Sequence, residues 1–216
     1  MRDLIILIPA HNEENAIRNI INKIEKKYDY LVVNDCSTDK TNFYLKNKKF
    51  IKNKVRLGYE GTLIKGFKYI IKNYKKKYIL TFDSDGQHLV SDIKKIYNVT
   101  KNNNVNLVVG ERSKKNRFIE NIFSIFFFNR FKIHDPLSGF KIYETLYLKK
   151  FINKISKKLY LVDIIIKFKS RSLSIKNIKI TSNLLKNRNA RVGNFLKTNF
   201  KIMKIFYHIF FKYNYL

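Results

Sequence analysis

The chain has 216 residues, a length that suits one domain, and 45% of them are hydrophobic, enough to build a core. Its 45 Lys and Arg residues outnumber its 16 Asp and Glu residues, so the formal net charge is +29 and anionic partners are favoured. The single cysteine, Cys36, excludes an internal disulfide. No stretch has the roughly 18 uninterrupted apolar residues of a membrane span, and no recognisable motif makes nucleic acid an expected partner.

Strand-like and helix-like segments alternate through the first half of the chain. Short apolar runs predict strands at 4–8, before Pro9, and at 30–33, 50–55, 78–82 and 106–109. Apolar residues at helical spacing predict helices at 13–26, 39–45, 58–73 and 92–100, with Thr38 or Asp39 as N-cap of the second. This alternation predicts an α/β fold with a mainly parallel central sheet and helices on both faces. Ligands of such sheets bind beyond the carboxyl ends of the strands.

The second half is dominated by aromatic and basic residues. Residues 160–170 are helix-like, and 174–181 are a predicted strand. The segments 118–131 and 195–215 combine aromatic residues with basic ones, and the second contains neither Pro nor Gly. They suit either a membrane interface, with lysines toward anionic lipid, or ordinary core helices.

The segment DSDGQH follows the fourth predicted strand and places Asp83 and Asp85 one residue apart. Two like charges this close destabilise each other unless a cation or hydrogen bonds lie between them. Mg²⁺ and Mn²⁺ prefer oxygen ligands, and Gln87 could supply a further one. The alternative is a solvated turn, because Asp, Ser and Gly all favour turns.

Three other polar segments have two interpretations each. NDCSTD, after the second strand, could bind a base or a ribose, or could cap the next helix. PAHNEE offers Asn12 and Glu13 for the same two roles. The glycines of RLGYEGTLIKG would let a helix start close to a ligand, although their spacing matches neither common phosphate-binding loop. Cys36, His88 and His134 are interpreted as ordinary side chains.

The order of the segments is more specific than any one of them. IILIPAHNEE, LVVNDCSTD, RLGYEGTLIKGF, ILTFDSDGQH, VVGERS and HDPLSGFK resemble the family 2 glycosyltransferases of the GT-A fold. Within that family they are most similar to the dolichyl-phosphate mannose synthase group, which transfers sugars to polyprenyl phosphates. The resemblance covers about residues 4–141, with a weaker echo in LLKNRNARVGN. It implies a GT-A domain over residues 1–192 and a basic aromatic helical tail over 193–216.

The resemblance also implies roles for individual residues. The nucleotide-sugar would contact Pro9, His11, Glu13, Asp35, Gly61, Lys65, Asp83, Ser84, Arg188 and Arg191. The metal, Mg²⁺ or Mn²⁺, would bridge the two phosphates of the nucleotide and be held by Asp83, Asp85 and Gln87. The acceptor would contact Arg112, Ser138, Gly139, Phe140 and Lys141. Three positions depart from the family pattern, which usually has Asp, a small residue and Arg where this chain has Asn34, Glu111 and Lys141.

The implied reaction is a single in-line displacement with inversion, in which Asp85, Arg112 and Asp135 are the expected catalytic residues. An anionic lipid-phosphate acceptor would need no general base, whereas a sugar hydroxyl must lose a proton to a carboxylate. Asp135 is the first candidate for that base and Asp163 the second. We therefore expect a metal-dependent transferase, cytoplasmic and peripheral at the membrane, acting on a polyprenyl phosphate or another cell-envelope glycan. Transfer to a saccharide hydroxyl, or a binding subunit without turnover, are the alternatives.

Overall fold

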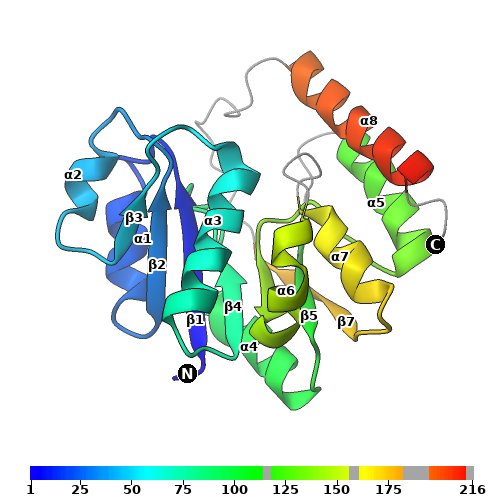
Figure 1. Ribbon diagram of the computed structural model, residues 1–216, viewed down its shortest axis with the longest axis horizontal. Helices are drawn as coiled ribbons and strands as arrows, with labels where there is room; N and C mark the ends of the chain where they lie inside the picture. Colours follow the sequence, from blue (N-terminus) through cyan, green and yellow to red (C-terminus); the bar gives the residue numbers. More distant parts are fainter. Residues whose placement is uncertain (114–117, 156–160, 182–194, 213–216) are drawn as a thin grey trace.

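The computed structural model describes residues 1–113, 118–155, 161–181 and 195–212 (Figure 1). The strands are β1 (Leu4–Ala10), β2 (Asp29–Asn34), β3 (Phe50–Lys52), β4 (Tyr78–Thr81), β5 (Leu107–Arg112), β6 (Lys141–Glu144) and β7 (Ile175–Ile180). The α-helices are α1 (Ile17–Ile24), α2 (Thr41–Leu45), α3 (Gly58–Asn73), α4 (Ser91–Asn102), α5 (Phe118–Phe131), α6 (Thr145–Phe151), α7 (Val162–Lys169) and α8 (Phe195–Lys212). A short 3₁₀ turn, η1 (Ile152–Lys154), follows α6.

The seven strands form one sheet in the order β3-β2-β1-β4-β6-β5-β7. The pairs β1–β2, β1–β4, β2–β3 and β5–β7 are parallel, whereas β6 runs antiparallel to both β4 and β5. The mainly parallel α/β fold is therefore confirmed. Because β6 is reversed, its first residue, Lys141, pairs with Thr81 and Val109 near the carboxyl ends of its neighbours. The segment that precedes β6 is thus delivered to the ligand-binding edge of the sheet.

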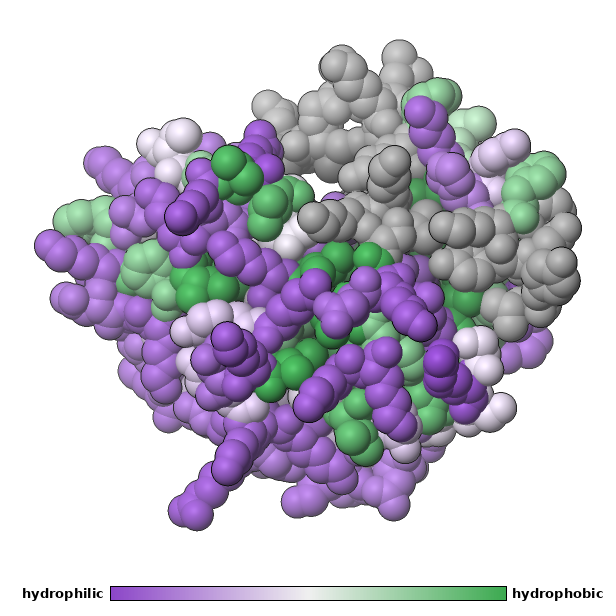
Figure 2. Space-filling model, in the orientation of Figure 1, coloured by the Kyte–Doolittle hydropathy of each residue, from purple (hydrophilic) through white to green (hydrophobic). Residues whose placement is uncertain are grey.

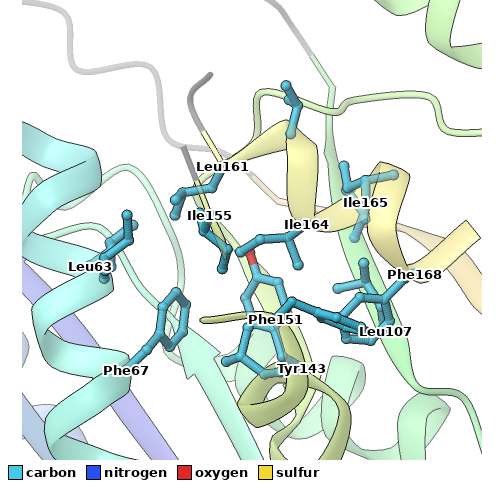
Figure 3. Close-up of a cluster of buried hydrophobic side chains, with 14 of the residues drawn as sticks. Leu63, Phe67, Leu107, Tyr143, Phe151, Ile155, Leu161, Ile164, Ile165 and Phe168 are labelled. Carbon is cyan, nitrogen blue, oxygen red and sulfur yellow. The ribbon is translucent and has the colours of Figure 1, made fainter. Parts of the chain in front are cut away.

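Helices cover both faces of the sheet because successive side chains of a strand point to opposite faces. In β1, Ile5 and Leu7 join one core with α3, α5, α6, α7 and α8. Leu4, Ile6 and Ile8 join the other core, with α1 and α4. Figure 3 shows the first core where Phe67 of α3, Tyr143 of β6 and Phe168 of α7 approach one another. Both faces of the sheet are thus sealed, and polar side chains reach a ligand only at the sheet edge.

The structure differs from the sequence-based expectation at several element boundaries. β1 continues through Pro9 instead of ending before it. Pro9 has no N–H, but β4 pairs with β1 only from Leu4 to Leu7, so that donor would fall beyond the end of the ladder. The short strand β6 and the helix α6 were not predicted from the sequence. None of the helices in the described ranges combines the length and apolar character needed to cross a membrane.

Candidate functional site

The carboxyl ends of β1, β2, β4 and β5 meet the start of β6 at one edge of the sheet. The predicted segments follow these strand ends, so residues far apart in the sequence become neighbours. Thr81 at the end of β4, for example, donates its hydroxyl to the carbonyl of Gly139 at 2.6 Å. The ordered series of polar segments therefore forms one site, as expected for an α/β sheet.

The loops after β1 and β2 are hydrogen-bonded to each other. The Asn12 N–H donates to Ser37 Oγ at 3.1 Å, and Asn12 Oδ1 accepts the Thr38 N–H at 2.9 Å. Asp39 accepts the N–H of Thr41, the first residue of α2, at 2.9 Å. The backbone N–H of buried Glu13 donates to the hydroxyl oxygen of Thr41 at 2.6 Å. Much of the polarity in these two segments therefore serves the loops themselves. The expectation that Thr38 or Asp39 is the N-cap of this helix was wrong, because the N-cap of α2 is Lys40 and makes no side-chain hydrogen bond, while Asp39 accepts the Thr41 N–H from one position earlier.

Asp35 is a buried anchor for the start of α3. Its Oδ1 accepts from Asn53 Nδ2 at 2.6 Å and from the Leu57 N–H at 2.8 Å, and its Oδ2 accepts from the Gly58 N–H at 2.9 Å. Its carbonyl oxygen lies 2.7 Å from His11 Nδ1. Asp35 thus positions the neighbouring loops and the start of α3.

A cavity of about 470 Å³ opens beside Asp35. It is lined by Cys36, Ser37, Lys52, Asn53 and Lys54. Lys65 of α3 reaches the same place, since its Nζ donates to the Lys52 carbonyl at 3.2 Å. The lysines at 52 and 54 were not singled out from the sequence, because a lysine after a strand is unremarkable in so basic a chain. The cavity stands where the resemblance expects the nucleotide.

Asp83 is held from two sides. Its Oδ1 accepts the Tyr59 hydroxyl of α3 at 2.8 Å, and its Oδ2 lies 3.2 Å from His88 Nε2. A Cβ at Gly139 would lie 2.0 Å from the same Oδ2, so only glycine fits there. Burial opposes ionisation, but His88, Tyr59 and the Arg112 charge together lower the pKa of Asp83. Asp83 is therefore an ionised carboxylate in a fixed orientation.

Asp85 lies two residues after Asp83, in the turn that follows β4. It is half-buried, and its Oδ1 accepts the Gln87 N–H at 3.0 Å across a turn in which Gly86 has φ +84°. Ser84, between the two aspartates, is buried and donates its hydroxyl to the Pro9 carbonyl at 2.7 Å, which ties β4 to β1. The Asp85–Gln87 hydrogen bond thus shapes the turn, and Ser84 secures it to β1.

The donor set at this turn suits a hard divalent cation with few protein ligands. Within the described parts of the chain, no group of three or more His, Cys, Asp and Glu side chains could enclose a metal. Mg²⁺ commonly binds through one or two carboxylates and completes its shell with substrate phosphates and water. Asp83 and Asp85 meet that requirement, so the residues fit the metal that the resemblance implies.

Arg112, at the end of β5, is bonded to two carboxylates. Its Nε and Nη2 donate to the two oxygens of Asp135 at 2.8 and 3.0 Å, and its Nη2 also donates to Glu120 of α5 at 3.2 Å. Burial opposes the charge of Arg112, but these carboxylates outweigh it and raise the pKa of the guanidinium. Glu120 was not anticipated, because nothing in its spacing from Arg112 indicates a contact.

The two candidate bases are poorly placed to take a proton. The Asp135 side chain is only 1% exposed, and both of its oxygens accept from Arg112. Asp163, in the first turn of α7, is fully buried. The geometry at Asp135 suits a positioning role better than the expected role as a base. Arg188 and Arg191 lie outside the described residues.

The segment before β6 contributes mainly structure. Phe140 is fully buried and packs against the rings of Phe82 and His88, so its ring supports the turn instead of reaching an acceptor. Ser138 Oγ accepts the Phe140 N–H at 3.2 Å. Lys141 is buried and donates to the Ser138 carbonyl, and burial lowers its pKa to about 8. Lys141 therefore adds a cation beneath the site.

Residues 5–168 match the family described as glycosyl transferase family 2. An uncharacterised protein of Methanocaldococcus jannaschii is 31% identical over 168 residues, covering 68% of this chain and 73% of its own length. A protein of Methanococcus voltae, named UDP-N-acetylglucosamine–dolichyl-phosphate N-acetylglucosaminyltransferase, is 28% identical over 190 residues, covering 72% of this chain and 74% of its own length.

Solved structures show the same fold. Glucosyl-3-phosphoglycerate synthase from Mycobacterium tuberculosis in complex with phosphoglyceric acid has a TM-score of 0.72 at 15% identity, over 95% of this chain and 78% of that one. Its complex with Mn²⁺, UDP and glucosyl-3-phosphoglycerate has a TM-score of 0.69 at 14% identity, over 95% and 77%. Together with the matched sequence segments and their gathering at one sheet edge, this establishes that the chain belongs to glycosyl transferase family 2 and is a glycosyltransferase of the GT-A fold.

Proposed function

We propose that the enzyme transfers a sugar, with inversion and with Mg²⁺ or Mn²⁺, from a nucleotide-diphosphate sugar to a polyprenyl phosphate. The carrying observation is that Arg112 stands between the Asp83–Asp85 turn and α5, the helix that borders an apolar groove. The Methanococcus voltae relative supports the acceptor class, since its name gives a dolichyl phosphate. The structure of glucosyl-3-phosphoglycerate synthase with Mn²⁺ and UDP supports a divalent metal and a nucleotide-diphosphate sugar as donor.

The apolar groove lies between α5 and α8 and has a volume of about 290 Å³. It is lined by Ile119, Ile122, Phe123, Ile202, Met203, Phe206, Tyr207 and Phe211. Ile119 is adjacent in sequence to Glu120, which contacts Arg112, so the groove begins beside the cationic part of the site. A ligand with a phosphate at one end and a hydrocarbon chain at the other would contact Arg112 and the groove together.

At the opposite end of the site, the cavity beside Asp35 would receive the nucleotide. Lys52 and Lys54 line it and supply positive charge, and His11, Asp35 and Lys65 stand around it. The Pro9 carbonyl, engaged by Ser84, fixes the strand end next to it. Glu13 and Gly61 are buried in the loop and the helix that frame this region. Glu13 and Gly61 would therefore affect donor binding by shaping the pocket, and not by direct contact with the donor.

The metal would be held by Asp83, Asp85 and Gln87, and it would neutralise charge that develops on the departing diphosphate. Tyr59 and His88 fix the orientation of the Asp83 carboxylate. Arg112 holds the acceptor phosphate in line with the anomeric carbon. The acceptor oxygen then forms its bond to that carbon as the bond to the diphosphate breaks, and the electron pair leaves with the nucleotide.

The placement of the two candidate bases favours a phosphate acceptor over a saccharide hydroxyl. A hydroxyl must give up its proton as it attacks, and a base within hydrogen-bond reach must accept it. Asp135 is occupied by Arg112, and Asp163 is enclosed in the core. A phosphate oxygen is already anionic at neutral pH, so it needs neither of them.

Contact with a membrane surface follows from the same acceptor. Side chains of α8 that are apolar or aromatic reach solvent, among them Met203, Tyr207 and Phe211. In Figure 2 the surface in the region of α8, at the upper right, mixes hydrophobic and hydrophilic side chains. With a net charge of +29, the protein is suited to anionic lipid. We place it in the cytoplasm, peripheral at the membrane, where a polyprenyl phosphate would present its headgroup.

The donor class is tested by thermal stabilisation with a panel of nucleotide-sugars in the presence of Mn²⁺. We expect one donor to raise Tm, and the same donor to support transfer to a short-chain polyprenyl monophosphate in detergent. The absence of a shift with every donor would favour a binding subunit without turnover. Transfer to a soluble saccharide but not to the polyprenyl phosphate would overturn the acceptor assignment.

The metal assignment is tested by Asp85→Ala. Because such a cation binds through only one or two carboxylates, the loss of Asp85 should abolish Mn²⁺-dependent transfer and the Mn²⁺-dependent part of donor stabilisation. Asp29→Asn is the matched control, since Asp29 pairs with Lys49 and Lys76 on the surface at the start of β2. It should leave both measurements unchanged. Full turnover in Asp85→Ala would remove the metal role from this turn.

A further inference from the structure

The two carboxylates on Arg112 are bonded to it unequally. Asp135 receives Nε and Nη2 as a fork at 2.8 and 3.0 Å, and also accepts the Arg112 backbone N–H at 3.2 Å. Arg112 gives Glu120 a single bond, from Nη2 at 3.2 Å. A bidentate arginine–carboxylate pair is stronger and more rigid than a single bond. Of the two contacts, the one to Glu120 is therefore the one that an incoming anion would displace.

Both carboxylates are enclosed, so Arg112 has little positive charge to offer while they remain. The side chains of Arg112, Asp135 and Glu120 are 13%, 1% and 6% exposed. One guanidinium charge faces two carboxylate charges at hydrogen-bond distance. An acceptor phosphate that approached this cluster unchanged would meet the two carboxylate charges beside Arg112, and like charges at such distances repel strongly where water is excluded.

Glu120 sits where an acceptor would arrive. It lies in the first turn of α5, and its neighbours Ile119, Ile122 and Phe123 line the apolar groove between α5 and α8. The Arg112–Glu120 bond therefore joins the cationic centre to the wall of that groove. A hydrocarbon chain entering the groove would bring its own phosphate to the position that the Glu120 carboxylate occupies.

We propose that Glu120 is an internal stand-in for the acceptor phosphate, bound to Arg112 until that phosphate replaces it. The inference rests on the proposed function, and it makes Glu120 a determinant of acceptor class. An anion compensates Arg112 as Glu120 does, and so can exchange with it. A neutral hydroxyl cannot, because it would leave the displaced carboxylate and Arg112 without their mutual charge interaction.

The test is Glu120→Gln in the full chain, which keeps the side-chain shape and removes the competing charge. Binding of a short-chain polyprenyl monophosphate in detergent is measured for wild type and variant. We expect the variant to bind about tenfold more tightly, because the phosphate no longer has to displace a charged hydrogen-bond partner of Arg112. The KM for this acceptor should fall in the same proportion. The corresponding polyprenol, without phosphate, should bind both proteins equally.

A purely structural role for Glu120 predicts the opposite sign. If Glu120 served only to hold Arg112 in place, Glu120→Gln would weaken phosphate binding or leave it unchanged, and either result overturns the proposal. Glu25→Gln is the matched control, because Glu25 pairs with Lys48 on the surface, and its acceptor affinity should equal that of wild type. Should the glutamine variant fold poorly, Glu120→Asp withdraws the carboxylate by one methylene and should also tighten binding.

Donor stabilisation separates this inference from the proposed function. If a nucleotide-sugar with Mn²⁺ raises the Tm of both proteins but Glu120→Gln gains no acceptor affinity, the stand-in role fails and the function stands. If neither a donor nor the polyprenyl phosphate binds, both fail. If the variant gains as much affinity for inorganic phosphate as for the lipid phosphate, the result supports displacement of Glu120 by the phosphate charge alone. The hydrocarbon chain of the lipid would then contribute nothing to the displacement.

Discussion

At the residue scale, the tightest constraint in the site is the contact between Gly139 and Asp83. The side chain that alanine would add lies 2.0 Å from Asp83 Oδ2, and Asp83 cannot swing away freely because Tyr59 and His88 hold it. Helix α3, the loop after β4 and the turn before β6 therefore converge on one carboxylate. The turn before β6 therefore requires glycine because of a side chain 56 positions earlier in the sequence. Rules of local backbone conformation would not reveal this contact.

Gly139→Ala should therefore lower both stability and donor binding. Overpacking of this kind costs about 1–3 kcal/mol of unfolding free energy, and displacement of Asp83 should remove Mn²⁺-dependent stabilisation by the nucleotide-sugar. Urea unfolding and thermal shift measure the two effects. In a double-mutant cycle, Gly139→Ala should cost less in an Asp83→Ala background, because the clash is gone. Equal costs in both backgrounds would show that Asp83 is not the residue displaced.

Lys141 makes stability depend on pH. Burial lowers its pKa from 10.5 to about 8 in the folded protein. The unfolded chain therefore binds more protons than the folded protein between these two values, so this lysine penalises folding fully below pH 8 and not at all above pH 10.5. Between pH 8 and 10.5, the wild type should gain up to about 3 kcal/mol relative to Lys141→Met, measured by urea unfolding. A difference that is constant with pH would contradict the buried, weakly basic lysine.

At the scale of elements, the reversed strand β6 and the helix pair α5–α8 organise the site. β6 brings the glycine turn and Lys141 to the end of β4, and α5 brings Glu120 to Arg112. Phe123 and Phe126 of α5 pack on Phe206 of α8, which leaves other apolar side chains of the pair exposed. One helix thus carries both a polar contact to the site and one wall of the apolar groove.

Met203→Glu should separate lipid binding from folding. Met203 lines the groove and is 57% exposed, so a charge there should change the unfolding free energy by less than about 0.5 kcal/mol. The same charge within an apolar groove should weaken polyprenyl-phosphate binding by about tenfold or more. Phe43→Glu is the control, because Phe43 is 71% exposed on α2, far from α8 (Figure 1). An equal loss in both variants would mean that the groove is not the binding surface.

At the scale of the whole molecule, the net charge of +29 acts on association and not on the fold. Many of the lysines lie on the surface, where exposed ion pairs contribute little to stability. Summed over the molecule, however, they attract anionic surfaces, and the exposed apolar side chains of α8 then have a hydrocarbon layer to enter. Charge would bring the enzyme to the membrane, and the groove would select the acceptor there.

Purified protein should sediment with anionic vesicles at low ionic strength and much less with neutral ones. Raising the salt to about 0.5 M should release most of it, because the Debye length falls well below about 8 Å. Nucleotide-sugar stabilisation at the same salt reports that the protein remains folded. Equal binding to neutral and anionic vesicles, or binding that salt does not weaken, would show that charge is not what recruits the enzyme.

The local elements, and the places where polar segments interrupt them, could be predicted from the amino-acid sequence. The apolar periodicity around Ile5, Val32 and Leu80 specifies buried strands, and the segments that follow these strands lie at one sheet edge in any parallel arrangement. The family resemblance of those segments was confirmed on the same residues. This part is predictable because it depends on neighbours along the chain.

The three-dimensional structure was needed to show which polar residues are available to a ligand and which are hydrogen-bonded to one another. Asp35 is hydrogen-bonded to Asn53 and to the start of α3, and Asp135 is hydrogen-bonded to Arg112. Tyr59 and His88 orient Asp83. These pairings follow from the strand order and from the reversal of β6, a four-residue strand too short to be recognised by periodicity. Partners that far apart in the chain are chosen by packing, because a carboxylate bonds to whatever donor the fold places within about 3 Å.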